Sequence, residues 1–144
     1  MRVSIIEGAF AFVMIGLSEA FYIPYLNALG ASHLQIGLGA SLPVLMAGLI
    51  QLISPIALQK SGSRRKLIVF ATVGQALAFI PFALVWHLDH HLQVWSAIAA
   101  FAVSVAFGNL GASAWADWIG TIVPRKKRGK YFATRNRLLG VVQI

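Results

Sequence analysis

One basic stretch, Gln59-Lys60-Ser61-Gly62-Ser63-Arg64-Arg65-Lys66, divides the sequence between two long apolar runs. The run before it covers about 33–58, and the run after it covers about 67–86. At a rise of about 1.5 Å per residue, either run is long enough as a helix to cross a hydrocarbon core of about 30 Å. A compact cationic segment with glycine at its centre therefore predicts a tight turn between two membrane-spanning helices. Its charge predicts that the turn lies in the cytoplasm.

The composition supports a membrane location for the whole chain. Its 144 residues are 58% hydrophobic and 11% charged, whereas soluble domains carry about 25% charged residues. A net charge of +8 would indicate nucleic-acid binding in a soluble chain. Here the cations flank apolar runs and have no aromatic stacking platform between them, so no nucleic-acid partner is expected. The absence of Cys excludes disulfides and thiolate metal sites.

Four apolar runs predict transmembrane helices at about 3–25, 33–58, 67–86 and 93–119, and the start of a fifth at about 131–144. The expected fold class is an all-α, polytopic membrane protein. The N-terminus has some features of a signal peptide, but Glu7 interrupts the apolar core that a signal peptide requires, so a retained first helix is expected. The third helix carries one strongly polar interior residue, Gln75, and is expected to face lipid.

The cations also predict the orientation. One of the twelve Lys and Arg precedes the first helix, four lie between the second and third, and seven follow the fourth. The two opposite loops hold none, and the second of them, His87–His91, is interpreted as a solvated outer loop rather than a metal site. This distribution predicts an integral protein of the cytoplasmic (inner) membrane with its N-terminus in the cytoplasm.

A stripe of small residues runs along the fourth predicted helix at i, i+4 spacing. One face of this helix therefore lacks large side chains along its whole length, and small side chains let another helix backbone come close in lipid. In a fragment without the later helices, the stripe is expected to lack part of this contact. Its members are Ser96, Ala100, Ser104, Gly108, Ala112, Ala116 and Gly120.

The basic turn resembles a loop signature of the major facilitator superfamily. In that family a Gly, an acidic residue, a basic residue, a second Gly and paired basic residues join helices two and three. Aligned on Gly62, Lys60 takes the first basic place, and Arg64 with Arg65 takes the paired places.

The sequence departs from this signature at two positions. Pro55 stands where the first Gly belongs, and Gln59 stands where the family usually has Asp. A second segment, Trp115–Pro124 followed by Arg128-Gly129, is similar to the end of helix four in the same superfamily. There a Pro and an Arg-Gly pair lead into helix five.

The resemblance implies a secondary transporter of small solutes that works by alternating access, with twelve helices in two six-helix halves of 3+3 inverted repeats. The chain would supply helices one to four and the start of five. Its expected partners are the lipid bilayer, an unknown small-molecule substrate and the missing C-terminal helices. Leu138–Ile144 would reach only about 10 Å as a helix, so a fragment that transports nothing by itself is expected. No enzyme activity or cofactor is expected, since no nucleophile–base set, metal cluster or phosphate loop appears.

Three polar residues lie at membrane depth and are candidates for a substrate or proton site: Glu19, Gln51 and Asn109. Glu19 lies about two-thirds along a spanning helix, where a charge is costly unless it is paired, neutral or facing a cavity. The alternative for Glu19 is a position close enough to the outer interface to reach water. The alternative for each amide is a hydrogen bond to a neighbouring helix.

Asp117 lies at the inner end of the fourth predicted helix, close in height to Arg64 and Arg65. The resemblance implies that it belongs to a cytoplasmic charge network that latches one conformation, although Gln59 leaves that network incomplete. The alternative is casual pairing of an exposed Asp, worth under about 1 kcal/mol. The candidate gating loop and network comprise Lys60, Gly62, Arg64, Arg65, Asp117, Arg128 and Gly129.

Two other functions remain open from the residues alone. The chain could be a complete four-helix, proton-coupled exporter acting as an oligomer, like the small multidrug resistance family, with Glu19 as its proton site. Its lopsided charge argues against the dual-topology members of that family. It could instead be a non-transporting membrane subunit whose basic loops bind anionic lipid.

Overall fold

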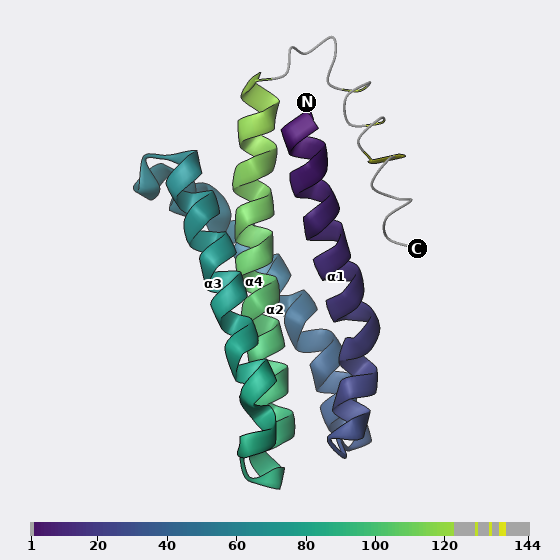
Figure 1. The fold of residues 1–144 in the computed structure, drawn as a ribbon. Coiled ribbons are helices and arrows are strands. Elements are labelled where there is room, and N and C mark those ends of the chain that lie inside the picture. Colours follow the sequence, from purple (N-terminus) through teal and green to yellow (C-terminus); the bar gives the residue numbers. More distant parts are fainter. Residues whose placement is uncertain (1, 123–128, 130–132, 134–135, 138–144) are drawn as a thin grey trace.

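The computed structural model describes residues 2–122, 129, 133, 136 and 137. Arg128 and most of the expected fifth helix at 131–144 lie outside the described residues. In the described part the chain is all-α, as predicted, and contains no strand (Figure 1). Its elements are α1 (Arg2–Ala28), α2 (His33–Ser61), α3 (Arg64–Leu84), the short 3-10 helix η1 (Val85–His87) and α4 (His90–Ile122).

Each of the four long helices contains a segment long and apolar enough to cross a membrane. These segments are Gly8–Ala28, His33–Ser61, Arg64–His87 and His90–Thr121. The chain is therefore a polytopic integral membrane protein, and its apolar surface contacts lipid.

The turns are shorter than the sequence indicates, because the helices extend into them. Of the basic stretch that separates α2 from α3, only Gly62 and Ser63 lie outside a helix. Gly62 ends α2 in the left-handed conformation, at φ 60°, which glycine adopts without steric cost. The Ser63 side chain then accepts a hydrogen bond from the Lys66 amide and caps α3.

The opposite turn is built in the same way. Gly30, at φ 78°, follows the last turn of α1, and the amide of Ala31 donates to the carbonyl of Leu26. Ser32 and Gln35 then form a reciprocal capping box at the start of α2. We call this end of the bundle, which also holds η1, the Gly30 end. The other end, with the α2–α3 turn, the start of α1 and the finish of α4, is the Gly62 end (Figure 1).

Helix α4 is the centre of the bundle and packs along both α2 and α3. The contact with α3 is close: a Cβ atom on Gly74 would lie 2.6–2.8 Å from three ring atoms of Phe107. The expectation that α3 faces lipid is therefore wrong for this side of the helix. Another side of α3 is exposed, as at Val69, Val73 and Ile80.

The small-residue stripe of α4 does not form one continuous contact. Ala100 and Ser104 are buried, but Ala112 and Ala116 are exposed. The close approach of α3 uses other positions in part, since a Cβ on Gly111 would lie 3.3 Å from the Cβ of Ala71. Within the described residues the stripe is thus covered only in part, because neighbouring helices cover different faces of α4 along its length.

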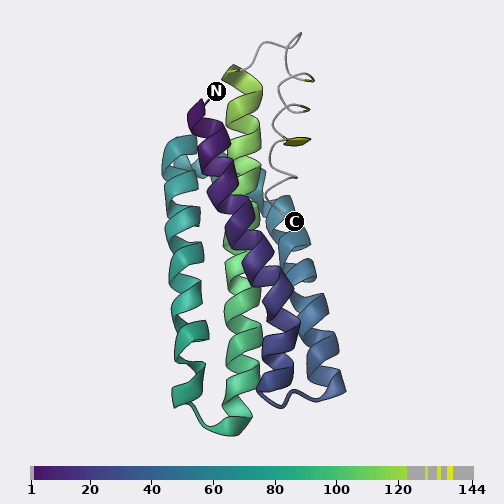
Figure 2. The same cartoon turned by 45° about the vertical axis from the view of Figure 1, so that its right-hand side comes forward.

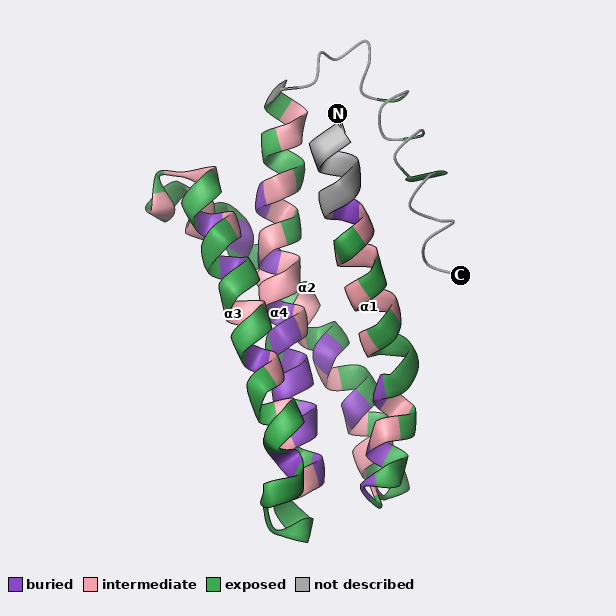
Figure 3. Ribbon diagram, viewed as in Figure 1, coloured by how far each residue is buried: buried purple, intermediate pink, exposed green. Residues whose placement is uncertain are grey.

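Two apolar clusters stabilise the bundle, and burial is concentrated on α4 (Figure 3). The first, at the Gly30 end, joins α1, α4 and η1 and consists of Tyr22, Leu26, Leu29, Val85, Val94, Ala97, Ile98 and Phe101. The second, toward the Gly62 end, joins α3 to α4 through Leu67, Ala71, Leu110 and Ala114. None of the α1 residues whose burial is described belongs to the second cluster. Helix α1 crosses α4 obliquely (Figure 2), and apart from Gly8 its described buried residues lie in its last turns.

Candidate functional site

A cavity of about 890 Å³ lies between α1, α3 and α4. Glu19 of α1 lines it, together with the amides Gln75 of α3 and Asn109 of α4. Hydroxyl groups and aromatic rings complete the lining, namely Ser18, Thr72, Ser104, Phe10, Phe12, Phe101, Phe107 and Trp115. The residues on α4 reach from Phe101 to Ala116, so the cavity occupies the half of the bundle toward the Gly62 end.

Glu19 reaches this cavity because the next turn of α1 is fixed. Tyr22, three residues later on the same face, is 4% exposed and stacks on Phe101 with ring centroids 3.8 Å apart. The Tyr22 hydroxyl is buried and finds no hydrogen-bond partner among the described residues, so the ring supplies the contact. One helical turn before this stacked pair, the Glu19 side chain lines the cavity.

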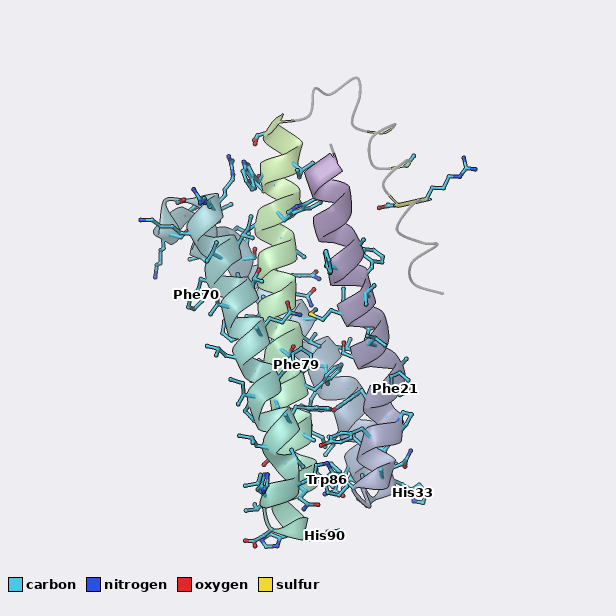
Figure 4. The ribbon with its side chains drawn as sticks, in the orientation of Figure 1. Phe21, His33, Phe70, Phe79, Trp86 and His90 are labelled. Atoms are coloured by element: carbon cyan, nitrogen blue, oxygen red, sulfur yellow. The ribbon has the colours of Figure 1, made fainter. Side chains whose placement is uncertain are left out.

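Aromatic side chains also pack α1 against α3 at the Gly30 end. The ring centroids of Tyr25 and Phe82 lie 4.5 Å apart, and the Tyr25 hydroxyl donates to the Phe82 carbonyl at 3.1 Å. Trp86 lies edge-on to Tyr25 at 6.4 Å, next to the turn (Figure 4). This aromatic packing was not predicted from the sequence. The available signal was the spacing of Tyr22, Leu26 and Leu29, which places three large apolar side chains on one helix face.

The two candidate amides meet each other. Gln51 Nε2 of α2 donates to Asn109 Oδ1 of α4 at 3.3 Å, and Asn109 Nδ2 donates to the Val105 carbonyl at 2.9 Å. Asn109 therefore joins the α2–α4 contact and also lines the cavity. Gln51 does not line the cavity, and its side chain makes the interhelical bond that the sequence offered as the alternative.

Gln75 was not among the candidate site residues, although it is the strongly polar interior residue of its helix. It lines the cavity and lies against α4, where a Cβ on Gly108 would be 2.7 Å from Gln75 Nε2. The signal that could have found it is Gly108 on α4, the glycine that lies opposite Gln75. A small residue opposite a long polar side chain leaves room for that side chain between the helices.

At the Gly62 end, Arg64 at the start of α3 forms an ion pair with Asp117 near the end of α4. Arg64 Nε lies 2.6 Å from Asp117 Oδ2, and the side chains are 41% and 47% exposed. Lys60 and Arg65 are exposed and form no ion pair within the described part of the chain. Of the other network candidates, Gly62 forms the turn, Gly129 has no atom within 4 Å of a built Cβ, and Arg128 is not described.

Histidine side chains gather at the opposite end. His33 begins α2, and His90 begins α4 (Figure 4). The expected loop His87–His91 is mostly helical, because His87 ends η1 and α4 starts at His90. The described residues contain no group of three or more His, Cys, Asp or Glu that could hold a metal ion.

Comparison with known proteins gives one family. The family model described as Major Facilitator Superfamily matches residues 8–143. Searches of curated proteins and of solved structures found no match.

Proposed function

The chain belongs to the major facilitator superfamily, whose members are membrane transporters rather than enzymes, and we propose that it works as a secondary transporter of small solutes by alternating access. The observation that carries the proposal is the difference between the two ends of α1. Toward the Gly30 end, its rings are packed against α3 and α4. Toward the Gly62 end, a cavity of about 890 Å³ separates it from them. In one state of an alternating-access transporter, the helices around the site pack together at one end and stand apart at the other.

We propose that the Gly62 end lies in the cytoplasm. The α2–α3 turn at this end carries Lys60 and Arg64–Lys66, and the turns at the Gly30 end carry no Lys or Arg. Short loops rich in Lys and Arg are retained on the cytoplasmic side of the inner membrane. The cavity then belongs to a state that is open toward the cytoplasm.

Glu19 is the proposed coupling or substrate-contacting residue. A carboxylate inside a membrane is expensive unless it is paired, neutral or facing a cavity, and Glu19 lines the cavity. Asn109 lines it from the opposite helix. Movement of α1 relative to α4 would change the surroundings of the carboxylate, so binding and conformation would be coupled.

The described helices are proposed to be part of a six-helix half. In a 3+3 inverted repeat, helix four is the counterpart of helix one, helix five of helix two, and helix six of helix three. Helix α4 packs along α2 and α3. The same arrangement applied to α1 gives it a fifth and a sixth helix as neighbours, which would account for the exposure of Leu17 and Phe21 of α1, at 59% and 64%.

The ion pair between Arg64 and Asp117 is the proposed latch on the cytoplasmic side. It joins the α2–α3 turn to the end of α4, so a movement that separates these two elements must break it. An exposed pair contributes about 0.2–1 kcal/mol, which is enough to shift a nearly balanced two-state equilibrium.

Single-cysteine labelling tests the function directly, because the chain contains no Cys. Ala112→Cys, in the cavity, should react with a membrane-impermeant maleimide from the cytoplasmic side. Leu88→Cys, next to the Gly30 turn, should react from outside, and Ser63→Cys should react only from inside. In the complete transporter, conditions that lower Ala112→Cys labelling should raise the labelling of a cysteine at Tyr25 from outside. Alternating access would be contradicted if the labelling of Ala112→Cys and the labelling of Tyr25→Cys never changed in opposite directions.

The alternative of a small exporter has its own experiment. Liposomes that contain only the 144-residue chain are expected to show no saturable solute uptake, because a second six-helix half is required for rocking. Saturable uptake, with a loss on Glu19→Gln, would support the oligomeric four-helix exporter instead.

A further inference from the structure

We propose that the cavity between α1, α3 and α4 selects hydrophobic organic cations. The inference rests on the proposed function, since it names the substrate class of the proposed transport site. Three features of the described lining support it: the sign of its charge, its aromatic rings and the chemistry of its remaining polar groups.

The charge of the lining has one sign. Glu19 is the ionisable residue among the lining residues, and the described lining contains no Lys, Arg or His. The cations that the structure describes at the Gly62 end, such as Arg64 and Arg65, do not line the cavity. An anion that entered would therefore meet a carboxylate with no compensating charge, whereas a cation would neutralise Glu19 at a depth where an unpaired charge is costly.

The aromatic rings supply a second preference for positive charge. Phe10 and Phe12 of α1 line one side of the cavity, and Phe101, Phe107 and Trp115 of α4 line the other. The face of an aromatic ring attracts a cation that lies within about 6 Å of its centre, most strongly when water is excluded. The same rings provide apolar contact area for the hydrophobic part of a solute. A hydrophobic cation can use both the ring faces and the apolar contact area. A sugar lacks the charge, and an inorganic ion lacks the apolar surface.

The remaining polar groups are neutral, and one of them is already engaged. Asn109 accepts from Gln51 and donates to the Val105 carbonyl. Gln75 and Thr72 of α3 also line the cavity. A polyhydroxylated solute needs many directional partners, and this small set of amides and hydroxyls is interspersed among rings and methyl groups. The cavity therefore offers one counter-charge in an apolar setting, which favours a cation with a large apolar surface.

Two probes of nearly the same shape and opposite charge separate these possibilities. Radiolabelled tetraphenylphosphonium and tetraphenylborate would be bound at equilibrium to the purified chain in nanodiscs, against empty nanodiscs. The expected result is saturable, competable binding of the phosphonium and none of the borate. Glu19→Gln should weaken phosphonium binding by about tenfold or more, because it removes the counter-charge. Glu19→Asp should retain most of the binding, and helical circular dichroism would show that each variant is folded.

Matched variants separate the cavity from the rest of the surface. Asp89→Asn removes a carboxylate at the Gly30 end outside the cavity and should leave phosphonium binding unchanged. Phe12→Leu should weaken phosphonium binding by about threefold, because it removes one aromatic ring from the lining. Phe21→Leu, on a side chain that is 64% exposed and does not line this cavity, is the control (Figure 4).

Equal binding of the two probes, absence of phosphonium binding, or equal binding by the wild type and Glu19→Gln would overturn the inference. The labelling experiment distinguishes this failure from failure of the proposed function. If opposite changes in labelling are seen without a preference for cations, only the substrate class is wrong. If phosphonium binds through Glu19 and the labelling never changes, the site exists but alternating access does not.

Discussion

The Gly30 end and the Gly62 end hold the same four helices by different means. At the Gly30 end, Leu26 and Val85 are fully buried, and rings from α1, α3 and α4 contact one another. At the Gly62 end, α3 and α4 share a small apolar cluster, one exposed ion pair links the α2–α3 turn to α4, and a cavity lies beside α1. Dense apolar packing resists displacement more than an exposed ion pair does. In the described part of the chain, α1 is therefore anchored by its last two turns, and its other end has fewer packed neighbours.

This comparison predicts where substitutions should be costly. Variants in the Gly30 cluster should reduce the free energy of unfolding, whereas variants at the Gly62 end should mainly change the balance between conformations.

The largest effect is expected for Leu26→Ala. Leu26 has no exposed surface, and removing a buried Leu side chain leaves a cavity that costs about 2–5 kcal/mol. The free energy of unfolding would be measured by titration of bicelle or mixed-micelle samples with sodium dodecyl sulfate, followed by circular dichroism. Leu17→Ala on the same helix is the control, because Leu17 is 59% exposed. Equal losses of unfolding free energy for the two variants would show that the buried Gly30 cluster stabilises the bundle no more than an exposed part of α1 does.

Gly39→Ala should have the next largest effect. A Cβ at Gly39 would lie 2.7 Å from Leu26 Cδ1 and 3.1 Å from the Tyr22 hydroxyl, so the buried Leu26 side chain or α1 itself must shift. Overpacking of this kind costs about 1–3 kcal/mol. Gly37→Ala, two residues earlier on α2, has no atom within 4 Å and should be neutral or slightly stabilising. A smaller loss at Gly39 than at Gly37 in the same unfolding titration would show that α1 is not anchored here.

The sequence was sufficient to predict the helices but not how their ends are packed. Four apolar runs predict four spanning segments because hydrocarbon admits few other backbone structures. The helix limits differ by a few residues: α1 continues past Pro24 to Ala28, and α2 continues through the first half of the basic stretch. A proline deprives the helix of one hydrogen bond, and in an apolar setting the chain keeps the others rather than ending.

The candidate site was predicted in part. Glu19 and Asn109 were chosen for being polar at membrane depth, and both line the cavity. Gln51 was chosen for the same reason, and its side chain instead bonds to Asn109. Polarity alone cannot tell a cavity-lining amide from one that links helices, because both avoid lipid. Tyr22 was not predicted as a core residue, since its burial depends on the placement of Phe101 on another helix.

The Gln51–Asn109 pair should contribute a smaller amount. A double-mutant cycle of Gln51→Leu and Asn109→Leu measures the coupling energy between the two amides, expected at about 0.6 kcal/mol for an interhelical hydrogen bond in a membrane. The bond lies between the two ends and joins α2 to α4, so it should not alter cavity labelling at Ala112. A coupling energy near zero in the unfolding titration would mean that the 3.3 Å contact is not maintained in the membrane.

The smallest effect on stability, and the largest on conformation, is expected at Arg64 and Asp117. Both side chains are more than one-third exposed, so Arg64→Gln or Asp117→Asn should cost less than about 1 kcal/mol, and less still in high salt. If the pair is a latch, either variant should change the labelling of Ala112→Cys from the cytoplasmic side. The charge-swapped double variant, Arg64→Asp with Asp117→Arg, should restore wild-type labelling, because it recreates the pair with its polarity reversed. Matched single variants at Arg65, which has no ion-pair partner within the described residues, should leave labelling unchanged. Failure of the swap to restore labelling, when each single variant changes it, would mean that Arg64 and Asp117 act separately and that the Gly62 end is held by apolar packing alone.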